Sequence, residues 1–175
     1  MRALLEGLLP KLFPDLDILC ISHDGKRDLE KSLPRKLRSW AVPGDRFVVI
    51  HDNDGSDCLL RKAGLAAICA NAGRPDTLVR IACQELEAWY IGEPDALAET
   101  FSDERLRSIG ARATYRDPDS VAKPSIHLAR LCPGFQKVSG ARALGPQMSY
   151  RRNRSRSFRA LIEGISRITG RPIPV

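Results

Sequence analysis

Two aspartates stand directly after a short apolar run, at Asp52 and Asp54, and Gly55 follows them. In a β-strand, residues two apart lie on the same face, so both carboxylates would point the same way from the carboxyl end of the strand. Open α/β sheets bind their ligands at that edge. Two adjacent carboxylates repel each other unless a cation lies between them, and hard oxygen ligands suit Mg²⁺ or Mn²⁺. A simple turn of Asp, Asn and Gly residues is the alternative interpretation.

A second acidic cluster, Glu85 and Glu87, lies where the apolar residues 78–83 give way to helical spacing. If this segment forms a strand beside the first, one of the two glutamates would reach the same sheet edge and complete a divalent-metal site. Residues two apart on a helix lie about 200° apart, so only one of them would face the metal squarely, and the pattern does not choose between them. The alternative is that both are acids near a helix start, where they favour the helix dipole.

Arginines gather near the end of the chain. Residues 1–119 hold 17 Lys and Arg against 20 Asp and Glu, whereas residues 120–175 hold 11 against 1. Guanidinium groups match phosphate geometry, and arginines at a helix start weaken the helix unless an anion balances them. That anion would be the phosphate of a nucleic acid or the protein's own acidic sheet edge, and a solvated basic helix without a partner is the third interpretation. The predicted nucleic-acid-binding residues are Arg151, Arg152, Arg154, Arg156, Arg159, Lys137 and Arg142.

The spacing of apolar residues predicts the elements that position these groups. We expect helices over residues 4–12, 28–40, 58–72, 123–131, 137–147 and 153–168, and strands over residues 18–21, 46–52 and 78–83. Asn153 is the expected N-cap of the last helix. Strands alternating with helices predict an α/β fold with a mainly parallel sheet flanked by helices. The length indicates one domain over residues 1–175, with an α/β body to about residue 100 and a basic helical portion packed on it.

The composition excludes several classes of protein. No apolar run is long enough to span a bilayer, and no signal peptide is recognisable. The five cysteines include no C-x-x-C pair and several have apolar neighbours, which favours reduced thiols in the cytoplasm over a disulfide scaffold or a zinc site. No P-loop, G-x-G-x-x-G motif or Ser-His-Asp arrangement stands out.

Several segments together resemble an uncharacterised bacterial family, domain of unknown function 4276, which is grouped with the Toprim-like folds. The resemblance covers nearly the whole chain in order. The segments that carry it are Leu8–Leu12, Asp52–Cys58, Arg80–Trp89, Tyr115–Asp119, Lys137–Leu144 and Asn153–Phe158.

The resemblance implies a Toprim-like fold in which a D-x-D motif and a glutamate on a first strand hold Mg²⁺ for phosphodiester chemistry. Asp52 and Asp54 match the D-x-D motif. In the family, a strand ending in glutamate precedes the leucine-rich opening helix, whereas this chain starts at that helix. Glu6 and Gly7 imitate the glutamate–glycine pair, but the leucines around them have helical spacing, so we expect Glu6 to be a surface helix residue. Either an upstream strand is missing or the protein lacks the acid–base glutamate.

Three functions are compatible with these patterns. The first is a Mg²⁺- or Mn²⁺-dependent nuclease in which Asp52, Asp54 and Glu85 are catalytic, the same three and Glu87 hold the metal, and the arginines bind the nucleic-acid backbone. The second is a non-catalytic nucleic-acid-binding or regulatory subunit that docks on an ATPase. The third is a phosphatase with Asp52 as the nucleophile.

Overall fold

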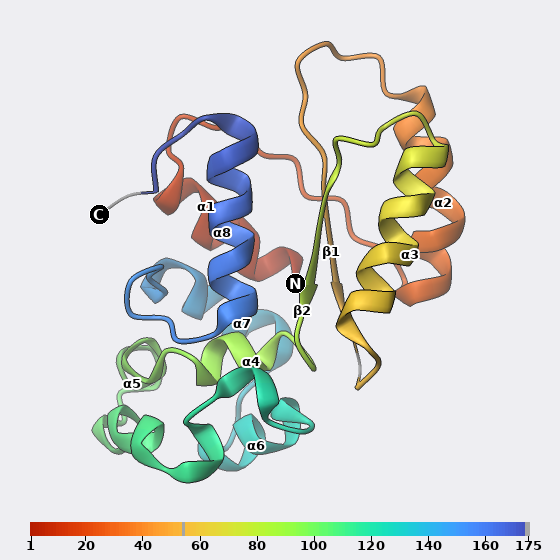
Figure 1. Cartoon of the computed structure of the whole chain (residues 1–175). Helices are drawn as coiled ribbons and strands as arrows, with labels where there is room; N and C mark the ends of the chain where they lie inside the picture. Colours follow the sequence, from red (N-terminus) through yellow and green to blue (C-terminus); the bar gives the residue numbers. More distant parts are fainter. Residues whose placement is uncertain (54, 174–175) are drawn as a thin grey trace.

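A two-stranded parallel sheet lies between two layers of helices in the computed structural model, which describes residues 1–53 and 55–173 (Figure 1). Asp54 and residues 174–175 lie outside the described residues. The elements are α1 (Arg2–Leu12), α2 (Gly25–Ser39), β1 (Val48–Asp52), α3 (Cys58–Asn71), β2 (Leu78–Ala82), α4 (Glu87–Ile91), α5 (Pro94–Phe101), three 3-10 helices (Glu104–Ala111, Ala113–Tyr115 and Pro118–Ser120), α6 (Pro124–Leu131), α7 (Lys137–Gln147) and α8 (Arg156–Thr169).

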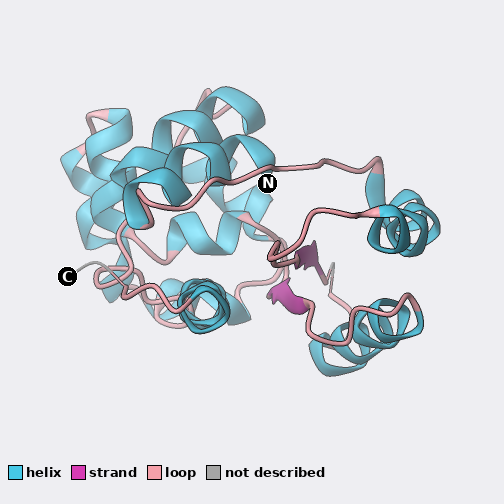
Figure 2. Cartoon of the chain, turned by 90° about the horizontal axis from the view of Figure 1, so that it is seen from above, coloured by secondary structure: helices cyan, strands magenta, loops and turns pink. Residues whose placement is uncertain are grey.

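The register of the sheet aligns the carboxyl ends of its strands, with Val48 opposite Leu78 and Asp52 opposite Ala82. Helices α2 and α3 cover one face, and α8 lies against the other (Figures 1 and 2). Because side chains alternate along a strand, β1 and β2 contribute to two apolar clusters. Val49 and Val79 pack with α2 and α3, whereas Leu78 and Ala82 join the larger core built around α1, α7 and α8.

The predicted α/β fold with a parallel sheet is therefore confirmed, but the strand expected over residues 18–21 is wrong. That segment forms no strand, and among the described residues the sheet consists of β1 and β2. Residues of this segment and of β1 line a groove of about 1430 Å³. Leu19 and Ile21, at 71% and 47% exposure, point away from the core. Alternating apolar residues at 18–21 thus lack the pairing partner that a strand requires.

The opening helix agrees with its prediction. The five leucines of α1 are buried, while Glu6 is exposed and pairs with Arg2 one turn away, as expected for a surface helix residue. Helix α1 packs closely on α7, and a Cβ atom on Gly145 would lie 2.7 Å from the carbonyl oxygen of Leu4. Glycine at this position lets the two backbones approach.

The final helix starts later than predicted. Ser155, not Asn153, is the N-cap of α8, and its hydroxyl accepts a hydrogen bond from the Phe158 amide at 3.1 Å. Asn153 is occupied elsewhere, because its side chain donates to the Trp89 carbonyl and accepts from the Ser155 amide. The apolar face of α8, formed by Phe158, Leu161, Ile162 and Ile165, is buried. Within the described residues, no helix is both long and apolar enough to cross a membrane.

The close contact of α1 with α7 predicts opposite effects of alanine at two helical glycines. Gly145→Ala would force a methyl group against the Leu4 carbonyl and should destabilise the protein by about 1–3 kcal/mol. Gly64→Ala on the exposed face of α3 meets nothing within 4 Å and should stabilise by about 0.5–1 kcal/mol. Urea unfolding measures both. A stabilised Gly145→Ala protein would contradict the tight packing of α1 on α7.

Candidate functional site

Residues from both strand ends meet in a small cavity at the carboxyl edge of the sheet. Asp52 ends β1, and Glu85 and Glu87 follow β2. A cavity of about 210 Å³ is lined by Met1, Asp52, Glu85, Leu86, Glu87, Tyr90 and Lys137. The structure thus brings Asp52 together with both glutamates of the second acidic cluster. Asp54, the other predicted member, lies outside the described residues.

The turn after β2 positions Glu85 and Glu87 at the cavity. Gln84 has a φ of 66°, a left-handed conformation that is strained for a residue with a side chain. Its backbone amide donates a hydrogen bond to the side-chain oxygen of the buried Asn53, which directly follows β1. Because Glu85 precedes α4 rather than lying within it, the angular argument for residues two apart on a helix does not apply. Glu85 and Glu87 therefore both reach the cavity.

The two glutamates lie in different surroundings. The Glu85 carboxylate accepts a hydrogen bond of 2.8 Å from the Ser125 amide in the first turn of α6, which anchors it across the cavity. Glu87 is the first residue of α4, and it is only 8% exposed. A buried carboxylate without a cation is costly, so the burial of Glu87 favours a site that attracts positive charge.

Tyr90 is a further residue of the site, and the sequence pattern does not indicate it. It is 1% exposed, lines the cavity, and its hydroxyl has no hydrogen-bond partner among the described residues. Burial raises the pKa of this hydroxyl, and the carboxylates of Glu87 and Asp52 raise it further. Tyr90 therefore keeps its proton and presents an unused donor. Leaving such a group unpaired costs about 1–3 kcal/mol, which is typical of a position completed by a ligand or water.

Lys137 brings positive charge to the same cavity. It is the exposed first residue of α7 and also lines the larger groove beside β1. Arg142, on the same helix, is exposed and lines that groove as well. Both were predicted to bind nucleic acid, and of the two, Lys137 lines the cavity with the carboxylates while Arg142 lines the neighbouring groove.

The oxygen atoms of the carboxylates that line the cavity are of the type that hard cations prefer. Carboxylate oxygens are the ligands that Mg²⁺ and Mn²⁺ prefer. Within residues 1–53 and 55–173, however, no three His, Cys, Asp or Glu side chains converge closely enough to hold a metal ion. The described residues therefore form an acidic cavity that fits a cation chemically without forming a closed coordination shell.

His51 and Asp52 point to opposite faces of β1, as alternation predicts. The His51 ring lies 3.3 Å from the Arg61 guanidinium on α3, which in turn pairs with Glu30 on α2. His51 is thus tied to the α2–α3 layer, whereas Asp52 lines the cavity on the other side.

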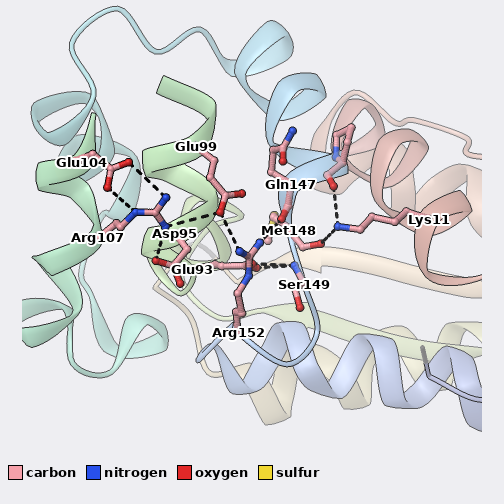
Figure 3. A network of polar contacts seen from close by, with 11 residues as sticks. Lys11, Glu93, Asp95, Glu99, Glu104, Arg107, Gln147, Met148, Ser149 and Arg152 are labelled. Atoms are coloured by element: carbon pink, nitrogen blue, oxygen red, sulfur yellow. Dashed lines mark hydrogen bonds and ion pairs between the residues drawn. The ribbon is translucent and has the colours of Figure 1, made fainter. Parts of the chain in front are cut away.

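Two of the predicted nucleic-acid-binding arginines have partners inside the protein. Arg152 pairs with Glu93 at 2.9 Å and with Glu99 at 3.0 Å, and Glu93 is completely buried (Figure 3). Burial raises the pKa of Glu93, while the Ser149 amide and the Arg152 guanidinium oppose this shift. Arg154 donates to the carbonyl oxygens of residues 91, 110 and 115. For both arginines the balancing partner is the protein itself.

The other three arginines of the run remain at the surface. Arg156 is 79% exposed and pairs with Asp117 at 2.9 Å. Arg159 lies over the Tyr150 ring, with its guanidinium carbon 5.0 Å from the ring centroid. Arg151 is exposed. Their prediction as nucleic-acid ligands stays a prediction.

A hydrogen-bond network around the buried carboxylate of Asp119 is not predicted by the sequence. Asp119 accepts hydrogen bonds from the Ser155 hydroxyl and from the amide and hydroxyl of Ser157. Ser157 in turn accepts from the Trp89 indole at 2.8 Å and from the Cys83 amide at 3.3 Å. The network fixes the start of α8 to the turn after β2. An isolated aspartate in a polar stretch gives no sequence signal for such a role.

Comparison with known proteins identifies a family. A family model described as "Domain of unknown function (DUF4276)" matches residues 1–166. No curated protein and no solved structure matches the chain significantly.

The burial of Glu93 predicts a pH-dependent effect of removing its partner. Arg152→Met would leave the Glu93 carboxylate uncompensated. We expect the free energy of unfolding to fall by about 1–3 kcal/mol at pH 7.5, which is less than for a fully buried ion pair because Arg152 is partly exposed. The pKa of Glu93 is already raised and would rise further, so its protonation on acidification should relieve the loss. Denaturant unfolding at pH 7.5 and pH 5 measures this difference.

Arg151→Met is the matched control, since Arg151 is an exposed neighbour with the same charge. It should change stability by less than about 0.5 kcal/mol at either pH. Equal losses in the two variants, or an Arg152→Met loss that grows on acidification, would contradict the assigned role of Glu93.

Proposed function

We propose that this chain, which belongs to the DUF4276 family, is a Toprim-like, divalent-metal-dependent phosphodiesterase that acts on nucleic acid. The observation that carries the proposal is the cavity at the carboxyl edge of the sheet, which is lined by Asp52, Glu85, Glu87 and Tyr90, the last with a buried hydroxyl that is unpaired among the described residues. Three carboxylates and an unused donor in one cavity are arranged for a ligand that combines a cation with hydrogen-bond acceptors. A phosphodiester bound with Mg²⁺ or Mn²⁺ has that chemistry.

Each cavity residue has a role in this proposal. Asp52, Glu85 and Glu87 would hold the cation together with Asp54, which matches the second position of the D-x-D motif. A metal bound there would supply an activated water and charge stabilisation for the leaving oxygen. Tyr90 would donate its hydroxyl proton in a hydrogen bond to a phosphoryl oxygen, because its raised pKa keeps it protonated.

The nucleic acid would approach along α7. Lys137 reaches both the cavity and the groove, and Arg142 lies on the groove side of the same helix. Two exposed cations next to an acidic cavity favour a polyanion whose phosphate enters the cavity and whose backbone continues over α7. Arg152 and Arg154 are left out of this surface, since both are engaged within the protein.

Metal binding is the first test. Asp52→Asn and Glu87→Gln, which remove charge without changing size, should each weaken Mn²⁺ binding by on the order of tenfold or more in calorimetric titration. Cleavage of plasmid DNA with Mn²⁺ should be lost in parallel. Asp76→Asn is the matched control, because Asp76 is an exposed carboxylate just before β2, at the opposite edge of the sheet. Unchanged Mn²⁺ affinity in both cavity variants would refute the proposal.

Polyanion binding is tested separately. The double variant Lys137→Gln/Arg142→Gln should weaken binding of a short DNA duplex and lower the salt dependence of its affinity by about two counterions. Lys62→Gln is the control, since Lys62 is an exposed cation of α3 on the other side of the sheet. Fluorescence anisotropy across a salt series measures the slope. Equal slopes for the wild-type protein and the double variant would exclude α7 as the contact surface.

One observation favours a second candidate, a non-catalytic nucleic-acid-binding or regulatory subunit of a bacterial ATPase-associated system. The carboxylates do not form a closed metal shell among the described residues, and Glu6 lies on the surface of α1 rather than in the cavity. Salt-sensitive DNA binding that persists in Asp52→Asn, without cleavage by the wild-type protein, would support this candidate over the first.

A further inference from the structure

We propose that Cys58 and Cys83 form a reversible disulfide, by exchange with a small-molecule disulfide such as oxidised glutathione, that staples the start of α3 to the end of β2. The two sulfur atoms lie 3.3 Å apart, although the residues are 25 positions apart in the sequence. Elsewhere in the described part of the chain, no two cysteine sulfurs are in contact. The pair therefore differs from the other three cysteines in having a partner already in place.

The position of each cysteine allows the bond to close. Cys58 is the first residue of α3, and Cys83 directly follows β2. A disulfide bond is about 2.05 Å long, so the sulfurs must approach by roughly 1.3 Å. Both residues are partly exposed and both border connections rather than the middle of an element, so a small shift of backbone and side chains suffices.

The surroundings link this pair to the sheet edge. The Asn53 side chain donates to the Cys58 sulfur at 3.0 Å and accepts from the Gln84 amide, so it bridges the two segments that the disulfide would join. Gln84 is the strained residue that directs Glu85 toward the cavity. A covalent link beside it would hold this turn in place. The proposal itself does not depend on metal binding or cleavage.

The exchange is balanced in atoms and electrons. The Cys58 sulfur loses its proton to solvent and attacks one sulfur of oxidised glutathione, which releases one glutathione thiol and leaves a mixed disulfide. Cys83 then attacks the Cys58 sulfur and displaces the second glutathione. Two S–H bonds of the protein are lost and one S–S bond forms, and the two electrons reduce oxidised glutathione to two thiols. An excess of dithiol reductant reverses both steps.

Peptide mapping of the full chain is the test. The folded protein is treated with oxidised glutathione, free thiols are blocked with N-ethylmaleimide, and the protein is digested without reduction. We expect a cross-linked peptide joining residues 58 and 83, with a mass two hydrogens below the sum of the two unmodified peptides, and loss of the cross-link on reduction. Cys83→Ser should instead retain one glutathione on Cys58, because no partner thiol displaces it, and Cys58→Ser should form no cross-link.

Cys20→Ser is the matched control, since Cys20 is also partly exposed but has no neighbouring sulfur among the described residues. It should form the cross-link as the wild-type protein does. The oxidised wild-type protein should also melt about 5 °C or more above its reduced form, a difference absent in Cys58→Ser. A stable glutathione adduct on Cys58 or Cys83 of the wild-type protein, or no reaction at either residue, would overturn the proposal.

Discussion

The hydrogen bond between the Gln84 amide and the Asn53 side chain holds together the part of the molecule on which the candidate site depends. Parallel pairing aligns the strand ends at Asp52 and Ala82, but pairing alone does not direct the side chains that follow. Asn53, which directly follows β1, accepts a hydrogen bond from the Gln84 backbone amide in the turn after β2. This bond holds Gln84 in a left-handed conformation that it would otherwise avoid. Glu85 and Glu87 then line the same cavity as Asp52.

A second constraint comes from buried carboxylates outside the cavity. Asp119 binds the start of α8 through Ser155 and Ser157, and Glu93 holds Arg152. These buried acids are satisfied by several hydrogen bonds each, as buried charges must be. Ser155 and Ser157 therefore dock the start of α8 onto the turn after β2, and Arg152 and Arg154 add internal contacts with residues 91–115. A strongly basic segment can therefore contribute arginines such as Arg152 and Arg154 to contacts within the protein, without every arginine binding a polyanion.

The extent to which sequence predicts this structure follows from the range of each interaction. Alternation along β1 correctly separates His51 from Asp52, because it depends only on local backbone geometry. The same alternation fails at residues 18–21, since a strand also needs a neighbour and that condition is set by tertiary structure. The role of Arg152 was equally inaccessible, because its partner lies 59 residues away in the chain. Tyr90 gave no signal, since a buried aromatic residue on a helix is ordinary.

The hydrogen bonding of the Tyr90 hydroxyl differs from that of the buried carboxylates outside the cavity. Asp119 and Glu93 are buried and fully engaged, whereas the Tyr90 hydroxyl is buried beside carboxylates and has no partner among the described residues. The strained Gln84 adjoins the same cavity. The unpaired Tyr90 hydroxyl and the strained Gln84 backbone both lower the stability of the free protein. Packing gives no reason for either of them. A ligand that accepts a hydrogen bond from Tyr90 would remove the cost of its unpaired hydroxyl, which is the energetic argument for assigning function to this edge of the sheet.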